Sequence, residues 1–80
     1  SSWQSKVVKF ADILANVSDL KNSELNQKQK IIQVKYKIKY LGVIKSGIVE
    51  NNNKIPNLFE AQNLLNSVFE QYGQQKITLF

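Results

Sequence analysis

The chain has no cysteine, histidine, arginine or methionine among its 80 residues. Without cysteine it has no disulfide, no thiolate nucleophile and no sulfur ligand for a metal. Without histidine it also lacks the usual general base near neutral pH and the usual transition-metal ligand. We therefore expect no catalytic residues, metal or cofactor, no small-molecule substrate, and a protein that is not an enzyme. Small secreted domains usually carry disulfides, so a cytoplasmic location is expected.

Two further absences limit the partners. No long apolar run is present, so we expect no membrane association. Because arginine is missing, all 11 cations are lysines, and they give a net charge of +5. Lysine is a hydrated point charge that attracts anions, whereas reading DNA sequence favours the bidentate arginine fork. Residues 1–80 are too few for more than one domain, and we interpret them as one small domain or as a fragment or half of a larger one.

A long strand is the element around which we predict the rest of the chain to be organised. Between Ile32 and Tyr40, apolar side chains alternate with polar ones. Successive side chains of a strand point to opposite faces, so this alternation predicts one apolar face and one cationic face. The apolar face comprises Ile32, Val34, Tyr36, Ile38 and Tyr40, and the other face comprises Gln33, Lys35, Lys37 and Lys39.

Two amphipathic helices flank this strand in the sequence. Apolar residues recur at steps of three and four over residues 3–20 and again over residues 57–72. Ser2 is a candidate N-cap for the first helix. Asn57 followed three residues later by Glu60 predicts a capping box at the start of the second. Gly73 stands where a left-handed residue commonly ends a helix.

The segments after the long strand and at the end of the chain are also predicted to be extended. Gly42 either marks a bulge in one bent strand that ends near Val49, which we favour, or Ser46 and Gly47 form the turn of a short hairpin. Residues 75–80 alternate again and predict a final strand.

The predicted fold class is therefore α+β, in the order helix, long strand, helix, strand, with both helices packed on a small sheet. Two strands alone make a marginal sheet in water. We expect a third, unrecognised strand, a second copy of the chain or residues beyond Phe80 to complete it.

Residues 34–42, Val-Lys-Tyr-Lys-Ile-Lys-Tyr-Leu-Gly, resemble the opening strand of phosphotyrosine-binding (PTB) domains, which often carries Tyr-Leu-Gly. The loop, helix and strand that follow are similar in order, so the resemblance covers about residues 32–80, the N-terminal half of such a domain. It implies a PTB-like fold. The family's peptide groove lies between a later strand and a C-terminal helix, so no ligand-contacting residue is carried over.

The favoured function is a non-enzymatic protein-interaction module. It would hold a peptide, a partner chain or a second copy by adding a strand to its sheet edge, with Lys35, Lys37 and Lys39 as the partner-binding residues that favour acidic partners. The alternative is a small basic protein that binds nucleic acid non-specifically along those lysines. Tyr36 and Tyr40 are assigned to the apolar face, which leaves the alternative without stacking platforms. A lysine face that is merely solvated remains a third interpretation.

Overall fold

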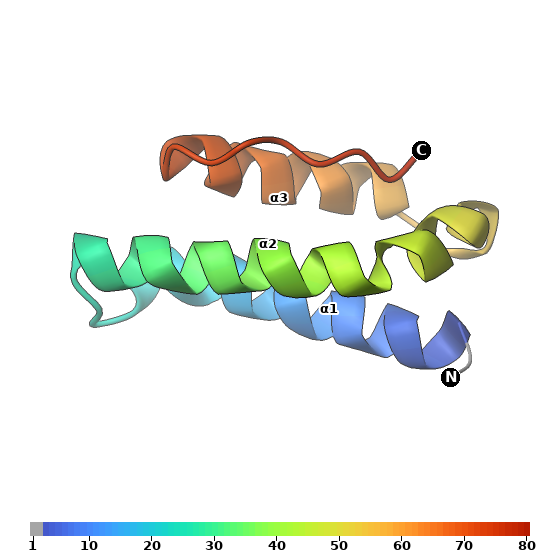
Figure 1. Ribbon diagram of the computed structural model, residues 1–80, viewed down its shortest axis with the longest axis horizontal. Coiled ribbons are helices and arrows are strands. Elements are labelled where there is room, and N and C mark those ends of the chain that lie inside the picture. Colours follow the sequence, from blue (N-terminus) through green and yellow to red (C-terminus); the bar gives the residue numbers. More distant parts are fainter. Residues whose placement is uncertain (1–2) are drawn as a thin grey trace.

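The computed structural model describes residues 3–80 and shows three helices followed by an irregular C-terminal tail (Figure 1). The helices are α1 (Trp3–Asp19), α2 (Gln27–Glu50) and α3 (Leu58–Gln71), and two single-turn 3₁₀ helices, η1 (Leu20–Asn22) and η2 (Asn52–Lys54), lie in the connections. Consecutive helices run in opposite directions, and the tail, residues 74–80, turns back along α3 (Figure 1). The described part therefore resembles a small helical bundle.

The predicted α+β fold is wrong, because residues 3–80 contain no strand and no sheet. The predicted long strand and both of its proposed continuations lie within α2. At 1.5 Å per residue, a helix of 24 residues is about 36 Å long, which matches the longest dimension of the molecule, 36 Å. The expected PTB-like fold is wrong for the same reason, since the residues that carry the resemblance are helical.

The alternation in the middle of the chain conceals a helical pattern. Val34, Ile38 and Leu41 follow one another at steps of four and three, and all three face the interior. The helix also has a complete capping box at its start. The Asn26 side chain accepts from the Gln29 N–H at 2.8 Å, and the Asn26 N–H donates to Gln29 Oε1 at 3.2 Å. Capping and burial together favour the helix over an isolated strand.

The two predicted helices are confirmed, with ends within a residue or two of those expected. Gly73 has a φ of 73°, so the left-handed end of α3 is also confirmed. The capping box at Asn57 is wrong. The backbone of Asn57 is in the left-handed region, with a φ of 60°. Its side chain makes no capping hydrogen bond, because an N-cap normally needs extended backbone to reach the first turn. The proposed cap at Ser2 lies outside the described residues.

All three helices and the tail contribute to one apolar core, in which α1 packs closely against both α2 and α3. A Lys54 ammonium 5.4 Å from the Trp3 ring centroid links η2 to the start of α1. The core residues are Phe10, Ile13, Val17, Leu20, Val34, Leu41, Ile44, Ile48, Leu58, Leu65, Phe69, Tyr72 and Leu79.

The predicted final strand is wrong as a strand, because no second strand lies beside the tail in the described part of the chain. Side-chain amides of α3 bind its backbone instead. Asn66 Oδ1 accepts from the Ile77 N–H at 2.7 Å, and Gln62 Oε1 accepts from the Leu79 N–H at 2.6 Å. Leu79 is fully buried, so the tail completes the core.

Candidate functional site

The positive charge of the protein is concentrated on one helix. Six of the 11 lysines and one of the six acidic residues lie in α2, and the five lysines and five acidic residues elsewhere cancel. Among residues 3–80, the one ion pair joins Lys76 Nζ to Glu70 Oε1 at 2.6 Å, far from these lysines in the sequence. Helix α2 therefore carries the whole net charge of +5, without a carboxylate partner in the described structure.

Helix α2 has a second apolar face that does not contribute to the core. Tyr36 is 63% exposed and Val43 73%, and Ile32 and Tyr40 are each 44% exposed. These four follow one another at steps of four, four and three residues, close to the helical period, so they run nearly parallel to the helix axis over roughly 17 Å. Two lysines share this face. The outer stripe consists of Ile32, Lys35, Tyr36, Lys39, Tyr40 and Val43.

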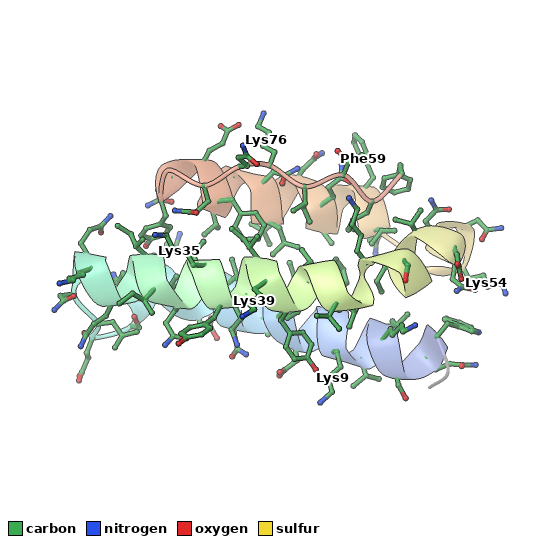
Figure 2. All side chains as sticks on the ribbon, in the orientation of Figure 1. Lys9, Lys35, Lys39, Lys54, Phe59 and Lys76 are labelled. Atoms are coloured by element: carbon green, nitrogen blue, oxygen red, sulfur yellow. The ribbon has the colours of Figure 1, made fainter. Side chains whose placement is uncertain are left out.

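Part of the outer stripe is a depression in the protein surface. Ile32, Lys35, Tyr36 and Lys39 line a shallow, mainly apolar depression. Because a lysine can lay its methylene stem along an apolar surface while its ammonium stays in water, Lys35 and Lys39 contribute to both the walls and the charge. Figure 2 shows these two lysines along α2.

A second depression extends the outer stripe toward α1. Tyr40 and Val43 line it from α2, and Lys6 and Lys9 line it from α1. Lys9 is labelled on α1 in Figure 2. Helix α1 therefore adds positive charge beside the C-terminal half of the stripe, which makes the cationic border longer than α2 alone provides.

The three lysines predicted to bind a partner do not form one face. On a helix, residues two positions apart point about 200° from each other, so Lys37 is turned away from Lys35 and Lys39. Lys37 is half-buried and lines a separate depression with Asn16 and Asp19, at the end of α1. The structure thus brings two of the three predicted residues together and separates the third.

Sequence reasoning missed the apolar half of this surface. Tyr36 and Tyr40 were assigned to the core because an extended chain would place them on the same side as Val34. In a helix they lie on the opposite side, since Val34 is fully buried while both tyrosines are exposed. The signal in the sequence was the presence of two separate helical stripes within the one alternating pattern.

The outer stripe combines exposed apolar contact area with positive charge. In residues 3–80, no three acidic, histidine or cysteine side chains gather where they could hold a metal ion. None of the helices in this range combines the length and apolar character needed to cross a membrane.

Comparison with known proteins gives no identity for the chain. No family model, no curated protein and no solved structure matches it.

Proposed function

We propose that the protein is a non-enzymatic interaction module whose outer stripe binds an acidic amphipathic helix of a partner protein. The observation that carries this proposal is the exposed apolar row of α2, flanked by Lys35 and Lys39 on the helix that holds the whole net charge. An amphipathic helix is recognised by anchor residues at steps of three and four, and the exposed row has this spacing.

The arrangement of charge favours an acidic partner over a second copy of the same surface. If two outer stripes packed against each other, Lys35 and Lys39 would approach the same lysines of the copy. Like charges brought together across an interface cost several kcal/mol. A partner helix with leucines opposite Ile32 and Tyr36 and glutamates opposite the lysines satisfies both requirements. The sheet-edge mechanism expected from the sequence has no sheet to act on in residues 3–80, so the helix face replaces it.

The test uses a synthetic helical peptide with leucine at steps of three and four and glutamates on both flanks. We expect titration calorimetry to detect binding that weakens as salt is added, because the lysines and glutamates attract each other through screened charge. The double substitution Lys35→Glu and Lys39→Glu should weaken binding by at least about tenfold, since it turns attraction into repulsion.

A matched control separates the surface from the overall charge. Lys45 is also an exposed lysine of α2, but it lies outside the outer stripe. Lys45→Glu combined with Lys21→Glu, a change at an exposed lysine of η1, gives the same change in net charge as the double substitution. We expect these control changes to weaken binding by no more than about threefold. Equal losses in both pairs, or no binding of the peptide by the unchanged protein, would contradict the proposal.

One observation favours a second candidate, a module that binds single-stranded nucleic acid. Tyr36 and Tyr40 are exposed beside Lys35 and Lys39, and exposed aromatic rings next to cations can stack with bases while the lysines meet phosphates. This candidate predicts tight binding of a mixed-sequence oligonucleotide, with a log–log salt slope of about −1.4 if Lys35 and Lys39 each cover a phosphate. Binding of the acidic peptide in preference to the oligonucleotide would favour the first function.

A further inference from the structure

The tail is held from one side only. Asn66 binds both backbone groups of Ile77, accepting from its N–H at 2.7 Å and donating to its C=O at 2.9 Å. Leu79 is bound in the same way by two residues, with its N–H donating to Gln62 Oε1 at 2.6 Å and its C=O accepting from Asn52 Nδ2 at 3.3 Å. Alternate residues of the tail therefore direct their backbone groups toward the body of the protein.

This hydrogen-bonding pattern requires extended backbone. Gln62 and Asn66 are one helical turn apart, close to 6 Å along α3, and they bind residues two apart in the tail. Two residues of extended chain cover about 6.6 Å, so the two spacings match. The amide side chains of α3 thus occupy the place that a neighbouring strand would take.

The other edge of the tail is unpaired. In extended backbone, the N–H and C=O of one residue point to one side, and those of the next residue point to the other. The backbone groups of Lys76, Thr78 and Phe80 consequently point away from Gln62 and Asn66. Within residues 3–80 they have no protein hydrogen-bond partner, and all three residues are exposed.

We propose that this outer edge pairs with the same edge of a second copy, which forms a two-stranded antiparallel ribbon across a two-fold axis at Thr78. Thr78 then exchanges two backbone hydrogen bonds with the partner's Thr78, and Lys76 pairs with the partner's Phe80. An edge with unpaired N–H and C=O groups is a template for such pairing. This surface is separate from the outer stripe and does not depend on its function.

The residues of the tail favour this occupant and this direction. In the antiparallel arrangement Lys76 lies opposite an aromatic ring, whereas a parallel arrangement would place Lys76 beside its own copy and bring like charges together. If the register of the strand pair shifted by one residue, Ile77 and Leu79 would have to pair with the second copy. Asn66 and Gln62 already bind the backbone groups of these two residues. Those amides cover the inner edge of the tail, so only the outer edge is open to pairing. A third copy therefore has no free edge to join, and the assembly is a closed dimer.

The experiment is sedimentation equilibrium of the whole chain from about 10 µM to about 1 mM, a range that covers the weak affinity expected of one short strand pair. We expect the average mass to rise from monomer toward dimer. Thr78→Pro removes the central outward N–H while keeping the backbone extended, and should weaken the dimer by roughly tenfold or more. The matched control Thr78→Val keeps the N–H and should dimerise like the unchanged protein.

Hydrogen exchange supplies a second measurement that needs no substitution. In dilute protein the Ile77 and Leu79 amides should exchange slowly because Asn66 and Gln62 bind them, while the Thr78 amide exchanges fast. At high concentration the Thr78 amide should become protected as well. A monomer throughout the concentration range, a Thr78→Pro variant as dimeric as Thr78→Val, or a Thr78 amide that stays fast at high concentration would each overturn the proposal.

Discussion

Gly42 and Gly47 lie five residues apart on α2 and have different surroundings. A Cβ added at Gly47 would overlap the Lys6 side chain, so the absence of a side chain there leaves room for the Lys6 stem against α2. At Gly42 nothing lies within 4 Å of an added Cβ, and the residue is exposed. Gly73 differs again, because its φ of 73° ends α3 in a conformation that other residues rarely adopt.

The first prediction concerns Gly42. Glycine in a helix interior costs roughly 0.5–1 kcal/mol relative to alanine, and no packing requirement at Gly42 offsets this cost. Gly42→Ala should therefore raise the free energy of unfolding by about that amount, measured by urea denaturation. Gly73→Ala is the counterpart and should lower it by about 1 kcal/mol, because alanine is strained at positive φ. A destabilised Gly42→Ala variant would mean that this position is not an open site on a helix.

At the scale of the element, α2 accounts for most of the difference between the fold predicted from the sequence and the observed fold. The alternation from Ile32 to Tyr40 fits a strand, yet the same residues contain two helical stripes on opposite sides. A period of two and a period of 3.6 are hard to tell apart over nine residues when both faces of a helix carry apolar side chains. Asn26 and Gln29 form a capping box, which indicates the start of a helix. This local pattern could have distinguished a helix from a strand in the sequence.

Elements with a single apolar face were predicted well. Helices α1 and α3 pack one stripe on the core and leave a mainly polar outer side, with Val8, Phe59 and Leu64 as its exposed large apolar residues, so their periodicity has one interpretation. The candidate site was predicted in part: Lys35 and Lys39 share the exposed face, whereas Lys37 and the two tyrosines were misplaced with the strand. The binding of the tail by Asn66 and Gln62 could not be predicted, because it depends on tertiary contacts that sequence spacing does not encode.

The second prediction distinguishes a helical α2 from a strand. Val34 is fully buried and Tyr36 is 63% exposed, although a strand would place both on one face. Val34→Ala should lower the free energy of unfolding by about 2 kcal/mol through lost burial and a cavity, while Tyr36→Ala should change it by less than about 0.5 kcal/mol. Urea denaturation of both variants measures the difference. Similar large losses at both positions would contradict the assignment of Tyr36 to the outer stripe.

At the scale of the whole molecule, charge is distributed unequally. Helix α2 carries the net charge of +5, and the rest of the chain is neutral overall. Lys35 and Lys39 are one turn apart on the same face, where like charges destabilise a helix by a few tenths of a kcal/mol. If the outer stripe binds an acidic partner as proposed, the lysines that attract this partner slightly lower the stability of the unbound protein.

The third prediction follows from this cost. Lys35→Glu places a negative charge one turn before Lys39, the favourable orientation for a helical ion pair, and reduces the net charge. We expect the free energy of unfolding to rise by about 0.5 kcal/mol at low salt, while binding of the acidic helical peptide weakens. Denaturation and binding measured on the same sample test both parts. A variant that binds less and is also less stable would instead show that Lys35 contributes to the fold.

The amide groups that fasten the tail respond to the solution differently from the lysines of α2. Asn52, Gln62 and Asn66 neither gain nor lose a proton over the physiological range, and their hydrogen bonds carry no net charge for dissolved ions to screen. Apart from the exposed ion pair between Lys76 and Glu70, these contacts of the tail are therefore insensitive to changes in acidity and ionic strength. If the outer stripe binds an acidic partner as proposed, rising ionic strength would weaken that binding while the amide hydrogen bonds of the tail stay in place.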